Sequence, residues 1–187
     1  MQTKLIIDDD FISKWCPKYD KIQKDDEKYK KILTNVKKEI DKNNNLSKDT
    51  FQKIIDWKAA RARGKINWNN FKSYQDSITD CLNAPDDKKI SILDNLEGMG
   101  VAFASTILHF IYPDSFPIID FRTTEVLYYG GYIKSKIKDP KRYIAFRNVI
   151  LGIAKDYPRW SLREIDKALF AYHKIELAPK IKYSKEK

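Results

Sequence analysis

The sequence has few cysteines and no long apolar run, and these absences exclude several classes of protein. Only Cys16 and Cys81 occur in 187 residues, far apart and without CxxC spacing. A disulfide framework, a four-cysteine zinc site and an iron–sulfur cluster held within the chain are therefore excluded. The longest apolar run, residues 101–112, is too short to cross a bilayer. Because the first residues carry acids where a signal peptide is apolar, we expect a cytoplasmic protein without a membrane partner.

Other missing patterns narrow the chemistry. The chain has no phosphate-binding loop of the nucleotide hydrolases, no dinucleotide fingerprint and no clustered metal ligands. Ser105 has neither a paired histidine pattern nor a nucleophile elbow, so a serine hydrolase is not supported. We expect no organic cofactor.

Positive charge is what the sequence has in excess. The net charge is +10, and the residues from 101 onward hold 16 lysines and arginines against 9 acids. This excess predicts a polyanionic partner, because phosphates attract lysine and arginine over long distances. A genome-wide bias toward lysine codons is the alternative explanation.

Apolar spacing predicts an all-α fold of about eight to ten helices in a single domain over residues 1–187. Helix starts are marked by Ser47, by Asp139 followed by Pro140, and by the capping box Ser161 to Glu164. Alternating strand patterns are almost missing. The tail over residues 178–187 is expected to be flexible. Further helices are expected over 25–41, 69–82, 88–96 and 101–111, and from 121 onward.

Residues 96–120, LEGMGVAFASTILHFIYPDSFPIID, predict two helices joined by a tight glycine turn. Gly98 and Gly100 can adopt positive φ and let another backbone come close. The amides at the start of the second helix would then face outward and bind a DNA phosphate. An ordinary αα-hairpin with a tight turn is the alternative. The residues of this expected phosphate site are Gly98, Met99, Gly100, Val101 and Ala102.

The pattern LEGMGVAFA, followed after about twenty residues by PIIDFRTTEVL, resembles the helix-hairpin-helix DNA glycosylase superfamily. The strong match covers residues 88–130. The chain is most similar to a group of uncharacterised bacterial and archaeal members that share W-K, G-V-G-x-x-x-A-S, Y-P-I-x-D-x-R and L-R-x-x-D-x-A-L-W stretches. This resemblance implies two helical lobes around a cleft, a monomer, and K⁺ or Na⁺ at the hairpin. It implies DNA as the partner and a location at the nucleoid. It also implies hydrolysis of the N-glycosidic bond of a damaged, mispaired or modified base flipped from duplex DNA.

The resemblance gives Asp120 the catalytic role, in which a carboxylate stabilises positive charge on the sugar and orients a water. The residues alone offer a simpler reason for this acid, since Asp120 can cap the helix that starts at Phe121. The two roles are compatible. Ala102 stands where bifunctional members have a nucleophilic lysine, so this chain resembles the monofunctional, water-using branch.

Several other residues are candidates for contacts with DNA. Arg61, Arg63 and Lys65, in the segment ARARGKIN, and Arg122, beside Asp120, are expected to bind phosphates or the base; a solvated basic loop is the alternative for that segment. The aromatic candidates for stacking on a flipped base are Trp57, Trp68 and Tyr128, with core packing as the alternative.

The two histidines and the rival functions remain. His109 is expected to be buried and hydrogen bonded, and His173 to lie at the surface. A non-catalytic DNA-binding module and a helical interaction protein without nucleic acid are the rival functions.

Overall fold

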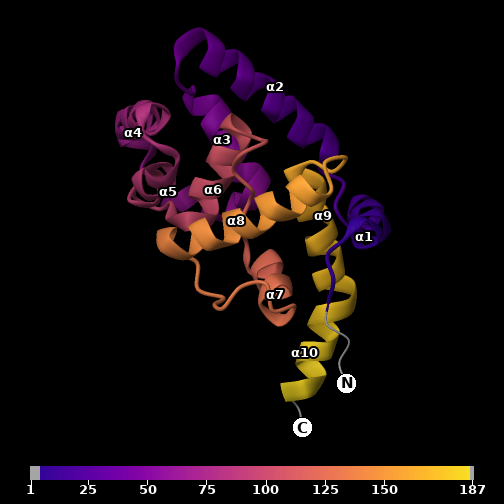
Figure 1. Ribbon diagram of the computed structural model, residues 1–187. Coiled ribbons are helices and arrows are strands. Elements are labelled where there is room, and N and C mark those ends of the chain that lie inside the picture. The colour runs from indigo at the N-terminus through magenta and orange to yellow at the C-terminus, as the bar shows by residue number, and fades with distance from the viewer. Residues whose placement is uncertain (1–4, 186–187) are drawn as a thin grey trace.

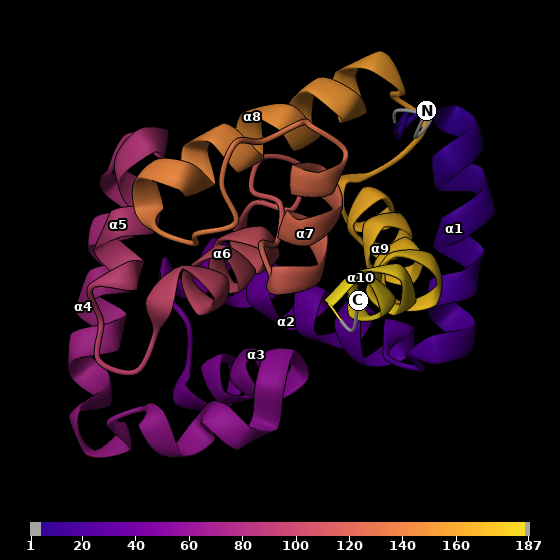
Figure 2. The same ribbon diagram turned by 90° about the horizontal axis from the view of Figure 1, so that it is seen from below.

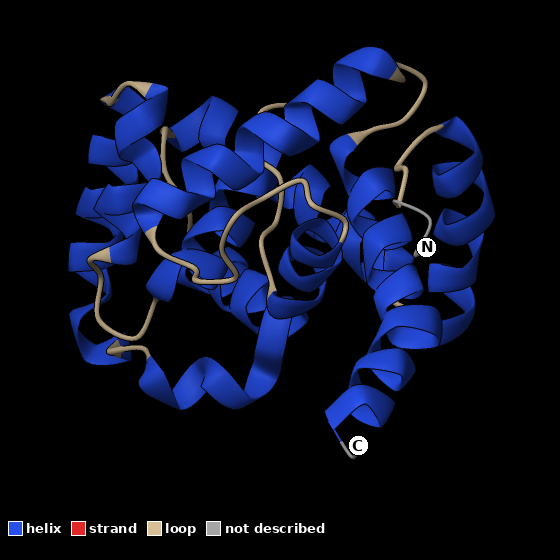
Figure 3. Ribbon diagram, turned by 60° about the horizontal axis from the view of Figure 1, so that its bottom comes forward, coloured by secondary structure: helices blue, strands red, loops and turns tan. Residues whose placement is uncertain are grey.

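The structure, a computed structural model, describes residues 5–185 (Figure 1). Every regular element in this range is a helix, which confirms the all-α class (Figure 3). The order is α1 (Asp9–Ile22), α2 (Asp26–Asn43), α3 (Lys48–Ala59), η1 (Ala60–Lys65), η2 (Trp68–Asn70), α4 (Phe71–Asn83), α5 (Asp86–Asp94), α6 (Gly100–Ile111), α7 (Phe121–Tyr129), α8 (Pro140–Asp156), α9 (Leu162–Tyr172), the π-helical η3 (His173–Leu177) and α10 (Ala178–Lys185).

The predicted helix starts are confirmed by the hydrogen bonds made there. Ser47 Oγ accepts from the Thr50 amide at 3.2 Å, and Asp139 caps α8 with Pro140 in the first turn. Ser161 and Glu164 form a complete capping box at α9. Each cap satisfies amides that have no partner within their own helix, which fixes where the helix begins.

Two helices were not predicted. In α1, Pro17 interrupts the apolar pattern, yet Asp8 caps the helix and one face is buried, with Phe11, Ile12, Trp15, Cys16 and Tyr19. The second is α10, which occupies residues 178–185 of the tail that was expected to be flexible. The remaining part of that tail, 186–187, lies outside the described residues.

The first and the ninth helices pack side by side, so the start and the end of the described chain meet (Figures 1 and 2). The rings of Phe11 and Trp15 lie 5.2 and 5.3 Å from that of Tyr172. Lys167 of α9 is buried and pairs with Asp20 at 2.9 Å and with Asp26 at 2.6 Å. These contacts tie α9 to both α1 and α2.

The core is one connected cluster of apolar side chains. On the opposite side from α1 and α9 lie α4 and α5, with α6 and α7 between the two groups (Figure 2). Fully buried residues come from all of these regions: Ile12, Phe51, Ile78, Ile90, Ile107, Leu127 and Leu169. None of the helices within residues 5–185 combines the length and the apolar character needed to span a membrane.

Candidate functional site: a cleft beside the glycine hairpin

The hairpin glycines adopt the conformation that the sequence predicted. Gly98 has φ +75° and Gly100 has φ +69°. A Cβ atom at Gly98 would lie 2.0 Å from the carbonyl oxygen of Lys65, whereas one at Gly100 would meet nothing within 4 Å. Gly98 is therefore required by the close approach of η1, and Gly100 by its left-handed backbone.

Not every amide of the hairpin is open to a ligand. The Met99 N–H donates to the Leu96 carbonyl at 3.1 Å inside the turn. The side chains of Met99 and Val101 are buried, while Gly100 is exposed. The first amides of α6, those of Gly100, Val101 and Ala102, lack helical partners, as at any helix start. The Met99 amide is therefore not part of the expected phosphate site, which keeps the amides of Gly100, Val101 and Ala102.

Polar contacts hold the basic segment of residues 61–65 beside the hairpin. Asn67 Nδ2 donates to Glu97 Oε2 at 3.2 Å, and the Tyr74 hydroxyl donates to the Glu97 carbonyl at 2.7 Å. Arg63 is tied down, because its guanidinium donates to both oxygens of Asp56. Among the described residues, Arg61 and Lys65 have no ion pair and remain available.

A cleft of about 360 Å³ opens among α1, α3, α6, α7 and α9, a size suited to a small ligand. It brings five of the sequence candidates together: Trp57, Arg61, Ala102, Asp120 and Arg122. It also contains residues that sequence reasoning missed: Tyr19, Gln23, Asp25, Lys58, Ala59, Phe103, Ile118, Phe121, Lys138, Arg163, Asp166 and Phe170. Arg63, Lys65, Trp68, Tyr128 and the hairpin residues 98–101 lie outside its lining.

Asp120 caps α7, as the simpler explanation predicted. Its Oδ1 accepts from the amides of Arg122 and Thr123 at 2.8 and 2.9 Å. Thr123 Oγ1 accepts in turn from the Asp120 amide at 3.1 Å, which completes a capping box. Within residues 5–185, Oδ2 of Asp120 has no hydrogen-bond partner. The cap therefore uses one oxygen of a half-buried carboxylate and leaves the other for a ligand.

A buried ion pair lies beside Asp120. Arg163 Nη1 donates to Asp166 Oδ2 at 2.5 Å, and Nη2 donates to the Tyr19 hydroxyl at 2.8 Å. The guanidinium also stacks on Trp57, with its central carbon 5.0 Å from the ring centre. Burial raises the pKa of Asp166, Arg163 opposes this rise, and the charge of Asp120 adds to it. Asp120 and Asp166 thus interact electrostatically in one cleft.

The cleft carries a net positive charge with unpaired cations. Its lining has five cationic and three acidic side chains, a net charge of +2. Arg163 pairs with two of the acids, Asp25 at 3.6 Å and Asp166. The other cations, Lys58, Arg61, Arg122 and Lys138, make no ion pair with any described residue. Arg122 stacks on the rings of Phe121 and Phe170, at 4.3 and 4.7 Å. Such a lining attracts an anionic ligand.

The three aromatic candidates have different environments. Trp57 is half-buried, lines the cleft and packs on Tyr29 and Phe110; its Nε1 is buried without a partner. Trp68 packs on Phe51 and Phe71 and donates from Nε1 to the Arg63 carbonyl at 2.9 Å, so core packing explains it. Tyr128 is exposed and away from the cleft. Only Trp57 is placed to stack on a base there.

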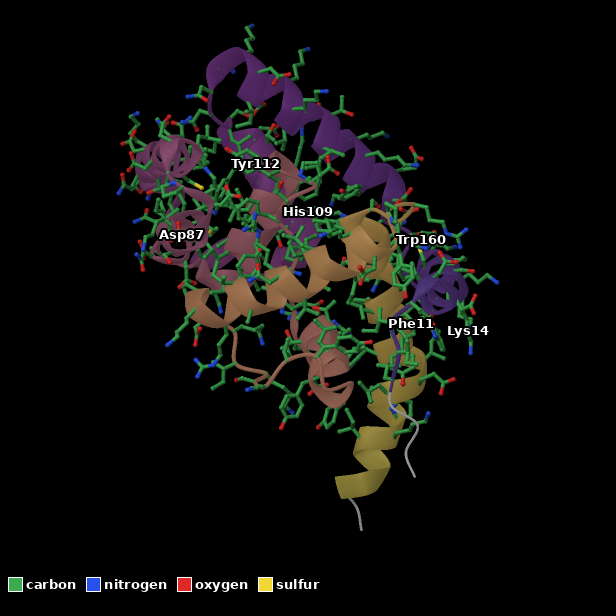
Figure 4. The ribbon with its side chains drawn as sticks, viewed as in Figure 1. Phe11, Lys14, Asp87, His109, Tyr112 and Trp160 are labelled. Atoms are coloured by element: carbon green, nitrogen blue, oxygen red, sulfur yellow. The ribbon has the colours of Figure 1, made fainter. Side chains whose placement is uncertain are left out.

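The two histidines do not belong to the cleft. His109 is buried in the interior, as expected (Figure 4). Its Nδ1 lies 2.9 Å from the Phe116 carbonyl oxygen, which can only accept, so Nδ1 carries the proton and donates. Its Nε2 therefore accepts from the Tyr29 hydroxyl, also at 2.9 Å. Burial lowers the pKa of His109 to about 3. The expectation for His173 was wrong: it is buried in the π-helical turn, 2.8 Å from Glu125 Oε2.

Some of the residues that sequence reasoning missed do have a signal in the sequence. Arg163, Asp166 and Lys167 interrupt an otherwise apolar face in SLREIDKALF, and charged residues on such a face are buried only when paired.

Comparison of the chain with protein-family models, with curated proteins and with solved structures finds no match in any of the three. In the part of the chain that the structure describes, no group of three or more His, Cys, Asp or Glu side chains could hold a metal ion.

Proposed function

We propose that the protein is a monofunctional DNA N-glycosylase that acts on a damaged, mispaired or modified base. The observation that carries this proposal is the unbonded Oδ2 of Asp120, in a cleft lined by Trp57 and by unpaired cations. A carboxylate placed in this way can stabilise the positive charge that develops at the anomeric carbon as the glycosidic bond breaks.

The route of the substrate follows from the surrounding groups. A DNA phosphate binds the amides of Gly100, Val101 and Ala102 at the positive end of α6, with K⁺ or Na⁺ as a further possible ligand of the turn. Arg61 and Arg122 bind neighbouring phosphates. The flipped nucleotide enters the cleft and its base stacks on Trp57. A base that pairs poorly costs least to extrude, which supports altered or mispaired bases as substrates.

Water is the nucleophile in this proposal. Ala102 has no amine with which to attack the sugar, so the hairpin cannot form a covalent intermediate. Asp120 orients this water through the oxygen that the helix cap leaves free. The reaction releases the free base and leaves an abasic site.

Incubation with labelled oligonucleotides tests the proposal. The substrates carry uracil, 8-oxoguanine, alkylated purines or hypermodified pyrimidines, and alkali then cleaves abasic sites. Asp120→Asn keeps the helix cap, because asparagine caps as well as aspartate. We expect this variant to lose about 10²-fold or more in rate while its DNA affinity stays within about threefold of wild type. The matched control is Asp8→Asn, the same change at the cap of α1.

A non-catalytic DNA-binding module is the second candidate. The capping box favours it, because that role alone accounts for an acid at position 120. This candidate replaces the first if wild type binds DNA but releases no base from any substrate. Weak DNA binding with little dependence on salt would contradict both, since several phosphate contacts produce a steep salt dependence.

A further inference from the structure

The largest group of exposed apolar side chains lies on α7 and the loop that follows it. Six large apolar side chains among the described residues are exposed, and four of them fall within residues 121–137: Phe121, Tyr128, Tyr129 and Ile137. The tyrosines expose 39% and 48% of their surface. Exposed apolar groups that cluster in this way mark a binding surface.

Lysines follow these aromatic rings along the chain. The loop 130–139 contains Lys134, Lys136 and Lys138. Lys136 Nζ lies 5.4 Å from the ring centre of Tyr128 and 5.2 Å from that of Tyr129. Lys136 Nζ also pairs with the half-buried Glu125, whose Oε1 lies 3.7 Å away. We refer to Tyr128, Tyr129 and Lys136 as the tyrosine–lysine platform.

The segment that carries the platform also contributes residues to the cleft. Phe121 and Lys138 both line the cleft, and both belong to the segment that carries the platform. Tyr128 and Tyr129 lie on the last turn of the helix that Asp120 caps.

We propose that the tyrosine–lysine platform binds a single-stranded segment of nucleic acid. Exposed rings offer faces on which unpaired bases stack, and the lysines bind the phosphates between them. The platform should discriminate against duplex, because the bases of a duplex are already stacked on each other. This inference goes beyond the proposed function and does not require that Asp120 be catalytic.

Binding of a labelled 12-residue oligothymidine to the full chain, measured by fluorescence anisotropy, tests the platform. We expect wild type to bind this strand more tightly than a duplex of equal length. Tyr128→Ala with Tyr129→Ala should weaken strand binding by about tenfold or more and change duplex binding by less than about threefold. Tyr128→Phe with Tyr129→Phe should keep wild-type affinity, since phenylalanine also stacks.

Salt dependence tests the lysine separately. Lys136→Gln should reduce the slope of log affinity against log salt by about 0.7 for the single strand. Lys42→Gln, an exposed lysine on α2, is the matched control and should leave the slope nearly unchanged. Ile6→Ala, which truncates an exposed apolar side chain elsewhere, controls for the alanine changes.

Two results would overturn the platform: equal strand binding by wild type and the double alanine variant, or no preference of wild type for the single strand. A protein partner is the conclusion in the second case. Because both tyrosines are exposed, the alanine variants should unfold at the wild-type urea concentration, which separates lost binding from lost structure. If the platform binds single strands but the protein releases no base, only the glycosylase proposal is contradicted.

Discussion

The backbone of Lys65 passes so close to Gly98 that a Cβ atom at this glycine would lie 2.0 Å from the Lys65 carbonyl oxygen. The contact holds the basic segment of residues 61–65 against the glycine turn. Two positions that are distant in sequence thus share one surface, and the geometry of the turn depends on a residue 33 positions earlier.

Alanine at the two turn glycines should have unequal effects. Gly98→Ala combines positive φ with a clash against backbone, so we expect it to cost about 3 kcal/mol or more of unfolding free energy. Gly100→Ala meets only the cost of its left-handed backbone, about 1–2 kcal/mol. Urea denaturation of both variants measures the difference. Equal losses would mean that η1 moves away from the hairpin at little cost.

The capping role of Asp120 can be measured without any substrate. Asp120→Ala removes the acceptor for two amides and should cost about 1–2 kcal/mol. Asp120→Asn should change the unfolding free energy by less than about 0.5 kcal/mol, because the amide oxygen still accepts. Thermal or urea unfolding checks both values. A large loss in the asparagine variant would show that the negative charge itself stabilises the fold, and the kinetic test would then need another substitution.

The buried pair of Arg163 and Asp166 should show strong coupling in a double-mutant cycle. Arg163→Met leaves Asp166 buried without its partner and should cost about 3–5 kcal/mol. Arg163→Met combined with Asp166→Leu should cost less than the sum of the two single changes, because position 166 then carries no uncompensated charge. Chemical denaturation of the four proteins gives the coupling free energy. Additive losses would contradict the pairing.

Stability should fall as the solution becomes mildly acidic, because His109 must stay neutral when folded. Its pKa is lowered to about 3 from the usual 6.5, so the unfolded chain binds more protons between these values. Stability is therefore lost as pH falls through about 6.5, by about 2 kcal/mol between pH 7 and pH 5. Urea unfolding at the two pH values measures the loss.

The matched variant for this pH effect is His109→Gln, whose amide can still donate and accept hydrogen bonds. It should be less stable than wild type at pH 7 but should lose much less on going to pH 5. Parallel pH profiles of the two proteins would assign the effect to other groups.

Local features of this fold were readable from the sequence because they depend on neighbours along the chain. Ser47, Asp139 and Ser161 cap helices through amides three residues away, and Gly100 needs glycine for its own positive φ rather than for a distant contact. The all-α class follows from apolar periodicity in the same way. The capping role of Asp120 was also predicted, because an aspartate directly precedes the helix that begins at Phe121.

Contacts between segments that are distant along the chain could not be predicted from the sequence. The sequence does not indicate that Arg163 meets Tyr19, 144 positions earlier, or that Trp57 stacks on the same guanidinium. Trp57 and Trp68 look alike as aromatic candidates, and only the packing of Phe51 and Phe71 separates them. His173 was placed at the surface because the π-helical turn that directs it toward Glu125 leaves no clear pattern.

The packing of α1 against α9 means that a growing polypeptide cannot complete its core until residues 162–172 of the 187 have been made. Tyr19 and Asp20 leave the ribosome long before their hydrogen-bond partners, Arg163 and Lys167, have been synthesised. Until then the apolar face of α1 has nothing to cover it. A fragment of residues 1–161 thus carries the hairpin and Asp120 but lacks the wall of the cleft that α9 supplies.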